Sequence, residues 1–351
     1  MHQKLRALGS VMAVLGSAGA LAACGSSDSP ASGSSSTTGS GSKAVKVAFF
    51  DFTLANPYGI ATADAAKKAA AAAGATIDVF DGGYDPNKQI NQIQDATASG
   101  KYQAMVIAPI DGAAVAPVAK AAINAGIKVV AWYTPIGKDP GSLDPQVPGL
   151  SSTVADPLVS NGTTRGQLIV QACASLKKAT CNVVVETGPI AGSFEKIRYE
   201  AIKKVLDRHP EIKQVAAPAL SAYSSEAGRT TAQDIAQAHS NVDVYSSASD
   251  DALRGAMPVI QRSSLKDARL IGNGATKWGV EQTRSGALWA DLGAFPATEV
   301  SKATALAIAS ARGQKVPASV PSVTISPLGT KIGLNLTQQA LSSHPTFKGE
   351  W

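Results

Sequence analysis

Short apolar runs alternate with segments of helical periodicity from Ala44 onward, and this alternation constrains the fold more than any other feature. The apolar runs predict strands at residues 45–52, 76–81, 104–108, 127–132, 182–187, 213–217, 242–246, 269–272 and 288–292. The segments between and after them predict helices near 57–73, 86–99, 112–125, 158–178, 194–208, 224–238, 251–262, 276–285 and 297–312. Strict alternation of strands and helices produces parallel sheets covered by helices on both faces. The sequence therefore predicts an α/β fold.

Polar and glycine residues mark the ends of these helices. Asn56-Pro57 and Asp85-Pro86 each combine a residue that favours the N-cap with a proline that suits the first helical turn. Gly74, Gly100 and Gly126 each follow a helical segment, where a left-handed residue commonly ends a helix. The predicted boundaries thus rest on capping chemistry as well as on periodicity.

The first 23 residues have the organisation of an export signal. Lys4 and Arg6 precede an apolar stretch at 7–20 that is too short and too diluted by Gly and Ser to span a bilayer. The stretch 21–25, LAACG, resembles the bacterial lipobox, which would make Cys24 a lipidated N-terminus; the alternative is an ordinary signal peptide with an incidental cysteine. Residues 25–42 are almost entirely Ser, Gly and Thr, and such a composition behaves as a flexible coil. We expect a signal peptide at 1–23 and a tether at 24–43.

Composition and charge exclude several classes of protein. An apolar content of 44% and a charged content of 17% describe a globular body rather than a disordered or multi-span membrane chain. The net charge is +6, but the densest basic clusters are the pairs Lys67-Lys68, Lys177-Lys178 and Lys203-Lys204, which are typical of solvated helix faces. No basic stripe interleaved with aromatics is present, so no nucleic-acid partner is expected.

Regular structure breaks between Tyr133 and Pro157, where five prolines and three glycines predict a loop that leads into a second lobe. The stretch from Val316 to Trp351 is rich in Pro and Ser and has only short apolar runs, so we expect it to recross the lobes and cover them. Nine strands would form one large sheet or two smaller ones, and this break favours two.

The chain lacks the residues that catalysis or a bound metal would need. His209, His239 and His344 are far from matching Cys or His residues, so no metal site is expected. The stretch 272–276, GNGAT, lacks the glycine spacing of a dinucleotide site, and no nucleophile has an adjacent base. We expect no cofactor and no enzymatic activity. In an oxidising compartment Cys173 and Cys181, eight residues apart, would form a local disulfide or remain as two buried thiols.

Polar and aromatic residues instead gather where predicted strands end and helices begin. Ligands of parallel sheets bind beyond the carboxyl ends of the strands, and flat aromatics with a few hydrogen-bonding groups suit a small polar ligand. Each residue also has a structural interpretation: Asn56 as a cap, Phe52 and Trp132 as core, Arg198 as a solvated charge, Asp250 as a first-turn helix residue. The candidate ligand-binding residues are Phe52, Asn56, Tyr58, Asp111, Trp132, Tyr133, Lys196, Arg198, Ser249, Asp250 and Asn273.

The chain resembles a known family in these same stretches. The resemblance rests on the opening strand with Asn56-Pro57-Tyr58, on 85–130 (DPNKQINQIQDATASG…INAGIKVV), on 249–256 (SDDALRGA) and on 271–288 (IGNGATKWGVEQTRSGAL). It is similar to the ribose-binding-protein-like, type I periplasmic binding proteins, which are the solute receptors of bacterial ABC importers. The likeness extends from Lys46 to about Pro327. It implies two similar lobes joined by three hinge segments, one lobe at 44–150 and 296–322 and the other at 151–295 and 323–351.

Some positions that bind sugar in ribose-type members match in this chain. The Asn before the Pro is retained as Asn56, and the aromatic after it is retained as Tyr58. An Arg that ribose-type members have in the second lobe aligns with Lys196 or Arg198 of this chain, depending on where a one-residue gap is placed.

Other positions depart from the family pattern. Where ribose-type members have a second aromatic residue, this chain has Gly59, and where they have an Asp-Arg pair it has Tyr133-Thr134. Three further family residues, an Asn, an Asp and a Gln, align with Ser249, Gly274 and Ala294 of this chain. Each charged contact to a hydroxyl pair contributes about 1.5–3 kcal/mol, so tight binding of a simple aldopyranose in the ribose manner is not expected. A modified sugar, a polyol, or a nucleoside-like or aromatic solute fits the remaining aromatics better.

The resemblance also implies a function and partners. The chain would be a monomeric lipoprotein on the extracytoplasmic face of the cell membrane that delivers a small solute to the permease of an ABC transporter. A receptor that signals to a membrane sensor protein is the alternative of a different class, and an exported enzyme is a third.

Overall fold

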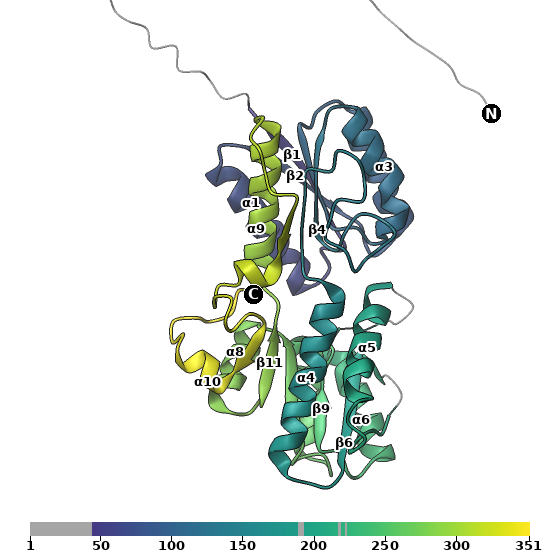
Figure 1. Cartoon of the computed structure of the whole chain (residues 1–351), viewed down its shortest axis with the longest axis vertical. Helices are drawn as coiled ribbons and strands as arrows, with labels where there is room; N and C mark the ends of the chain where they lie inside the picture. The colour runs from purple at the N-terminus through teal and green to yellow at the C-terminus, as the bar shows by residue number, and fades with distance from the viewer. Residues whose placement is uncertain (1–43, 189–192, 217–218, 222) are drawn as a thin grey trace, which may run out of the picture. The chain divides into compact units, whose positions relative to one another are not determined.

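Two parallel-dominated sheets form the framework of the computed structural model, which describes residues 44–188, 193–216, 219–221 and 223–351 (Figure 1). The first sheet has the order β12-β5-β4-β3-β1-β2, and all its pairs are parallel. Its strands are β1 (Lys46–Asp51), β2 (Thr76–Asp81), β3 (Ala104–Ile107), β4 (Lys128–Tyr133), β5 (Ser152–Ala155) and β12 (Ser319–Pro321). The predicted α/β fold is confirmed.

The second sheet has the order β13-β11-β10-β9-β6-β7, and β8 also pairs with β6. Its pairs are parallel except for β11 with β13. Its strands are β6 (Cys181–Thr187), β7 (Ile212–Gln214), β8 (Ala219–Leu220), β9 (Val244–Ser246), β10 (Arg269–Gly274), β11 (Ala290–Gly293) and β13 (Asn335–Thr337). We call the first sheet with its helices the first lobe, and the second sheet with its helices the second lobe. Both lobes belong to one compact unit of the chain.

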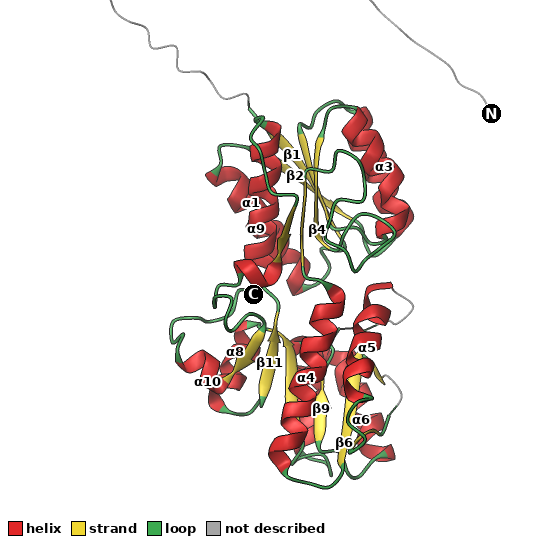
Figure 2. Cartoon of the chain, viewed as in Figure 1, coloured by secondary structure: helices red, strands yellow, loops and turns green. Residues whose placement is uncertain are grey.

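Helices cover both faces of each sheet, as Figure 2 shows in red. In the first lobe these are α1 (Pro57–Ala72), α2 (Pro86–Ala98), α3 (Gly112–Asn124) and α9 (Pro296–Ala311). In the second lobe they are α4 (Leu158–Leu176), α5 (Ser193–Leu206), α6 (Ser225–Ala238), α7 (Asp250–Gln261), α8 (Lys277–Ser285) and α10 (Gln338–Ser342). A short 3-10 helix, η1 (Ser322–Ile325), follows β12.

Strand β1 shows why a continuous apolar run folds this way. Its side chains alternate between the faces of the sheet: Val47 and Phe49 pack in one core cluster with α1 and α9, while Ala48 and Phe50 pack in another with α2 and α3. Both faces are buried, so every position except the first must be suited to the core. The second lobe repeats the arrangement, with separate core clusters on the two faces of β6.

The chain passes between the sheets three times: from β5 to α4, from β11 to α9, and from β12 to β13. The first crossing corrects a prediction. The stretch 133–157 was expected to be a loop, but Ser152–Ala155 forms β5, which pairs in parallel with β4 in the first sheet. The expected boundary of the first lobe at residue 150 therefore falls before its last central strand.

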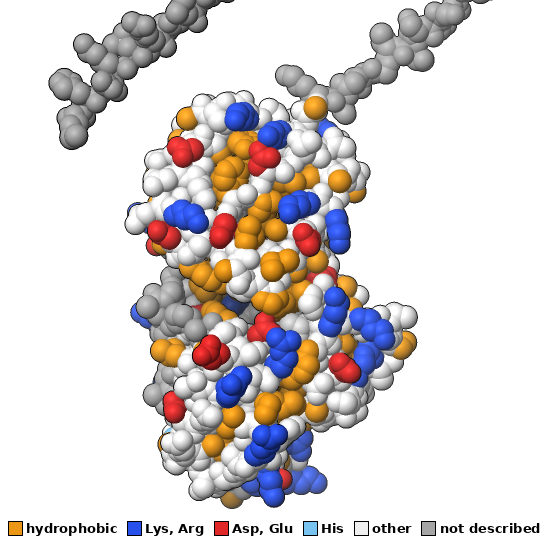
Figure 3. All heavy atoms as spheres, turned by 180° about the vertical axis from the view of Figure 1, so that it is seen from behind, with side chains coloured by type: hydrophobic (Ala, Val, Ile, Leu, Met, Phe, Trp, Pro, Cys, Tyr) orange, Lys and Arg blue, Asp and Glu red, His pale blue; other side chains and the backbone are white. Residues whose placement is uncertain are grey.

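On the face shown in Figure 3, basic side chains are distributed over both lobes among acidic, apolar and neutral ones. Lys67, Lys68, Lys203 and Lys204 are exposed, and Lys203 pairs with Asp207 one turn along α5. The interpretation of these pairs as solvated helix faces is confirmed for these four lysines.

Two further features concern the chain's environment. Within the described ranges, no helix combines the length and apolarity needed to cross a membrane. Cys173 near the end of α4 and Cys181 at the start of β6 are joined by a disulfide, with their Cα atoms 5.7 Å apart. The proposed signal, lipidated Cys24 and tether lie outside the described residues.

Candidate functional site

A pocket of about 140 Å³ lies where the carboxyl ends of strands from both lobes face one another. A cavity of about 150 Å³ accommodates one benzene ring, so the pocket has room for a ligand the size of a single ring. Most of the lining residues come from the ends of strands of both sheets and from the loops and helix starts that follow them. They are Phe52, Asn56, Tyr58, Tyr84, Tyr133, Asp156, Asn161, Phe194, Arg198, Tyr223, Ala248, Ser249, Asp251, Asn273, Gly274, Gly293, Ala294, Glu299, Leu334 and Trp351.

Aromatic rings form the first-lobe side of the pocket. Tyr133, the last residue of β4, lies edge-on to Phe52 with ring centroids 5.0 Å apart, and edge-on to Tyr58 at 6.0 Å. Beneath them, Trp132 is fully buried and lies parallel to Tyr58, with ring centroids 6.5 Å apart. Such packing holds each ring in one orientation. The pocket therefore presents rigid ring faces and edges on this side.

Asn56 connects the start of α1 to the pocket. Its Oδ1 accepts a hydrogen bond from the backbone N–H of Gly59 at 2.9 Å, while its Nδ2 donates to the hydroxyl of Tyr84 at 3.3 Å. Gly59 is required here because a Cβ at this position would lie 1.8 Å from the carbonyl oxygen of Thr53. The close approach of the Thr53 backbone thus explains why this chain has no aromatic residue at position 59.

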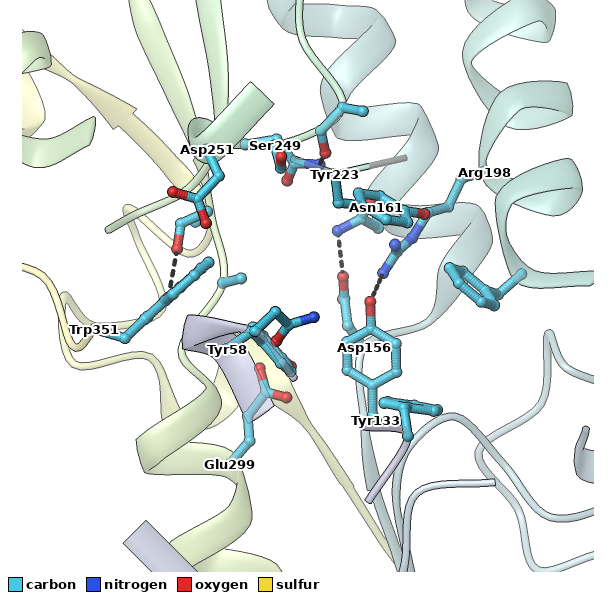
Figure 4. A pocket seen from close by; sticks show the side chains of 18 of the residues that line it. Tyr58, Tyr133, Asp156, Asn161, Arg198, Tyr223, Ser249, Asp251, Glu299 and Trp351 are labelled. Atoms are coloured by element: carbon cyan, nitrogen blue, oxygen red, sulfur yellow. Dashed lines mark hydrogen bonds between the residues drawn. The ribbon is translucent and has the colours of Figure 1, made fainter. Parts of the chain in front are cut away.

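Arg198 on α5 is the cation that lines the pocket, and it is held from both lobes. One guanidinium nitrogen donates to Glu195 Oε1 at 3.1 Å, and another donates to the hydroxyl of Tyr133 at 3.2 Å (Figure 4). Burial lowers the pKa of Arg198, but Tyr133 and Glu195 reverse this and raise it well above its ordinary value. The charge of Arg198 is therefore permanent and is already matched by Glu195.

Two further lining residues carry carboxyl groups: Asp156, which is half-buried, and Glu299, which is buried. Asp156 lies on the crossing from β5 to α4 and accepts a hydrogen bond from Asn161 Nδ2 at 2.7 Å, while burial raises its pKa. Burial, together with the nearby charge of Asp156, raises the pKa of Glu299 to about 8. Glu299 is thus largely protonated at neutral pH and has an O–H to donate.

Three of the lining tyrosines have left-handed backbones. The φ angles of Tyr84, Tyr133 and Tyr223 are 57°, 67° and 59°. Non-glycine residues in this region cost about 1–3 kcal/mol each and persist where the surrounding structure holds them. The backbone strain is concentrated at the pocket, which indicates that these rings are placed there by the fold.

The structure brings seven of the predicted site residues together at the pocket: Phe52, Asn56, Tyr58, Tyr133, Arg198, Ser249 and Asn273. Asn273 donates a hydrogen bond from its side chain to the carbonyl of Ala248 at 2.7 Å, and Ser249 caps α7 through the N–H of Ala252. The expectation placed them at one sheet edge; the structure places them at the carboxyl edges of two sheets that face one another. Whether they bind a ligand stays a prediction.

Four predicted site residues lie elsewhere, and two of these are helix residues facing away from the pocket. Asp111 caps α3 by accepting hydrogen bonds from the N–H groups of Ala113 and Ala114 at 2.9 and 3.0 Å. Lys196 is exposed, with its ammonium 4.0 Å from Glu200 one turn along α5. Of the two candidate cations on this helix, Arg198 is therefore the one that the structure places at the pocket.

The other two are buried beneath the pocket wall. Trp132 is fully buried in the core. Asp250 turns inward, where its carboxylate accepts hydrogen bonds from the N–H groups of Asn273 and Thr276, both at 3.0 Å. Its neighbour Asp251 lines the pocket instead. A strand-end position in the sequence does not show which of two adjacent carboxylates faces the ligand.

Several lining residues were missed by the sequence analysis. Tyr84 follows β2, so its strand-end position could have revealed it. Asp156 lies on the crossing from β5 to α4, outside every predicted strand and helix. Asn161 and Glu299 lie in the predicted helices 158–178 and 297–312, where periodicity does not show which side chain lines a pocket. Trp351 reaches the pocket from a segment that follows β13 and α10, and no local pattern indicates this.

Within the ranges that the structure describes, no group of three or more His, Cys, Asp or Glu side chains is arranged to hold a metal ion. The arrangement is instead suited to reversible binding, because rings supply stacking surface and the polar groups between them supply hydrogen bonds.

Comparisons with known proteins agree with the fold. Residues 47–315 match the family described as periplasmic binding protein domain. The ribose import binding protein RbsB of Salmonella typhimurium is 26% identical over 272 residues, which cover 77% of this chain and 86% of that protein.

Two solved structures share the architecture. An ABC transporter solute binding protein from Mycobacterium smegmatis with bound glycerol has a TM-score of 0.70 and 26% identity, covering 86% of this chain and 96% of its own. A periplasmic solute binding protein from Actinobacillus succinogenes with bound D-allose has a TM-score of 0.72 and 18% identity, covering 85% of this chain and 99% of its own. With its two-lobe α/β fold and its match over residues 47–315, this chain belongs to the periplasmic binding protein family, in its type I, ribose-binding branch.

Proposed function

We propose that this protein captures a sugar or sugar-like polyol between its two lobes and delivers it to the permease of an ABC transporter. The observation that carries the proposal is a pocket of single-ring size whose walls come from both lobes and whose cation is already neutralised. A neutral ring with hydroxyl groups at its edge fits such a site. The relatives support this choice, since one is named for ribose import and another holds glycerol.

The charge of the pocket argues against an anionic ligand. Arg198 is paired with Glu195, and Asp156 and Asp251 add carboxyl groups to the wall. An anion would have to displace Glu195 from Arg198 and face these carboxyl groups, which is unfavourable in a partly desolvated site. A neutral solute meets none of these costs. An aromatic or nucleoside-like solute is the alternative that the seven lining rings favour.

The location we propose is the extracytoplasmic face of the membrane. LAACG at 21–25 supplies a lipid attachment site at Cys24, and residues 25–42 supply a flexible spacer. A chain of this design would hold the binding lobes near a permease without restricting their closure. We further propose that the protein acts as a monomer and binds its solute without chemical change.

A thermal-shift screen tests the ligand class. A ligand that binds only the folded state at about 100 times its Kd stabilises a protein by about 2.7 kcal/mol, which corresponds to a rise of several degrees in Tm. We expect such a rise with at least one of D-ribose, D-allose, xylitol, myo-inositol and glycerol. Substitution Tyr133→Ala should abolish it, while Tyr199→Ala, outside the pocket on α5, should retain it.

Stabilisation by adenosine or benzoate alone would contradict the sugar assignment and favour the aromatic alternative. Conversion of the stabilising compound to a product during incubation would show an enzyme instead of a receptor.

A further inference from the structure

Residues 338–347 are fastened to the second lobe. The guanidinium of Arg284 on α8 donates hydrogen bonds to the carbonyl oxygens of Leu341, His344 and Phe347, at 2.8, 2.6 and 2.8 Å. Phe347 also lies edge-on to Phe295, with ring centroids 5.9 Å apart. The segment is thus fixed in position up to Phe347.

Gly349 then brings the chain against the loop before α8. Its φ of +86° is left-handed, and a Cβ there would lie 2.7 Å from the backbone N of Lys277. Only glycine combines this backbone conformation with so close an approach. The turn at Gly349 directs the next two residues toward the pocket.

Glu350 reaches across to the first lobe. Its Oε2 accepts hydrogen bonds from the backbone N–H groups of Ala297 and Thr298, at 2.9 and 3.1 Å, and its Oε1 accepts one from the hydroxyl of Thr298. These amides belong to the first turn of α9, where N–H groups have no partner within the helix. A carboxylate at this place also complements the helix dipole. Glu350 is therefore a helix cap supplied by the second lobe to the first.

Trp351 joins the same two lobes at the pocket. Its Nε1 donates to the carbonyl of Gly274 at 3.1 Å, and its own backbone oxygen accepts from the N–H of Lys277 at 2.9 Å. Its ring lies edge-on to Tyr58 of the first lobe, with centroids 5.3 Å apart (Figure 4). The indole also packs against Gly274, where a Cβ would lie 2.9 Å from Asp250 Oδ2 and 3.3 Å from Trp351 Cζ2.

We propose that Glu350 and Trp351 form a latch that joins the two lobes across the pocket, and that the indole of Trp351 selects for ligands with an apolar face. Glu350 and Trp351 contact both lobes at once only when the lobes are closed, so their contacts favour the closed arrangement. Gly274 and Trp351 both line the pocket, so a ligand on this side meets the indole ring. A ring whose C–H groups form one face suits this wall, and the ligand-selecting part of the inference rests on the proposed function.

Hydrogen exchange of the full chain tests the latch without any ligand. In Glu350→Ala the amides of Ala297 and Thr298 lose their acceptor, and we expect them to exchange at least about tenfold faster than in the unsubstituted protein. Glu226→Ala removes an exposed first-turn glutamate from α6 and should leave both rates unchanged. Equal exchange rates in Glu350→Ala and the unsubstituted protein would overturn the latch.

Isothermal titration with D-ribose, D-allose, xylitol, myo-inositol and glycerol tests the role of the indole. For each compound that binds, Trp351→Ala should weaken the affinity about tenfold or more, because both burial and ring contact are lost. Trp351→Phe, which retains a ring, should keep the affinity within about threefold. Unchanged affinity in Trp351→Ala would overturn the selection by Trp351. If none of these compounds bound the unsubstituted protein, the proposed function would fail in its sugar form, while the exchange rates would still decide the latch.

Discussion

At the scale of single residues, the pocket is governed by how each charge is matched. Arg198 is balanced by Glu195 and hydrogen-bonded to Tyr133, so it orders the site without offering a free cation. Glu299 is buried, with 5% of its surface exposed, and its raised pKa keeps it protonated at neutral pH. Both arrangements reduce the net charge that a ligand meets. They favour hydroxyl groups over ionised ones.

Glu299 gives the protein a defined pH dependence. Its pKa rises from 4.5 in the unfolded chain to about 8 in the fold. Between these values the folded state holds a proton that the unfolded state has lost, so the free energy of unfolding falls as pH rises through this window. Glu299→Gln removes this contribution. Relative to the unsubstituted protein, the variant should be more stable at pH 8.5 than at pH 5, with a difference of about 2–4 kcal/mol between the two conditions.

Urea unfolding of both proteins at the two pH values measures this difference. Asp51, whose raised pKa has causes that do not include Glu299, contributes equally to both proteins and cancels in the comparison. Glu226→Gln, an exposed glutamate, should show no such pH-dependent difference. If Glu299→Gln differed from the unsubstituted protein by the same amount at both pH values, Glu299 would not be protonated in the fold.

At the scale of elements, helix starts both build the lobes and supply the site. Asn56 and Asp111 cap helices on opposite faces of the first sheet, α1 and α3, through the same kind of hydrogen bond. Only Asn56 lines the pocket. Asp111 therefore has a structural role alone, whereas Asn56 both caps a helix and lines the pocket.

Substitution of each cap by alanine tests this separation. Asn56→Ala and Asp111→Ala should each lower the free energy of unfolding by about 1 kcal/mol, because an N–H group of the first turn loses its acceptor. Asn56→Ala should also weaken ligand affinity by several fold, while Asp111→Ala should leave affinity unchanged. Titration of both variants with the stabilising sugar or polyol measures the second effect. A loss of affinity in Asp111→Ala would restore this residue to the site.

The disulfide ties the end of α4 to the start of β6. Because the bond closes a short loop, its removal in Cys173→Ser/Cys181→Ser should lower the free energy of unfolding by about 2–3 kcal/mol. Urea unfolding with and without dithiothreitol measures it. The unsubstituted protein should lose stability with the reductant, and the double variant should not respond. A reductant-insensitive unsubstituted protein would indicate two free thiols.

The sequence predicted elements best where one local pattern decides. Helices α1, α2 and α3 begin at the predicted residues because cap and proline signals are local. Strand β5 was missed because Ser152-Thr153-Val154-Ala155 has little apolar character and lies among prolines; its neighbours β4 and β12 bury it. The inward turn of Asp250 and the arrival of Trp351 depend on segments far apart in the chain. Such tertiary contacts produce no periodic pattern in the sequence.

At the scale of the whole molecule, the chain crosses three times between two similar lobes, and residues of these crossings line the pocket. Asp156 follows β5 and Ala294 follows β11, while Leu334 precedes β13. Movement at the crossings would thus change the pocket directly. A ligand that contacts both lobes shifts the population toward closure by its difference in affinity for the two states. Such coupling would let a permease distinguish a loaded receptor from an empty one.

A crystal structure of the protein with the sugar or polyol that raises its Tm most tests the central claim directly. The predicted result is one ligand molecule in the pocket, in contact with Tyr133 of the first lobe and Asn273 of the second and within hydrogen-bonding distance of Arg198. Ligand density elsewhere on the protein, with this pocket free of it, would contradict the claim that the pocket is the solute-binding site.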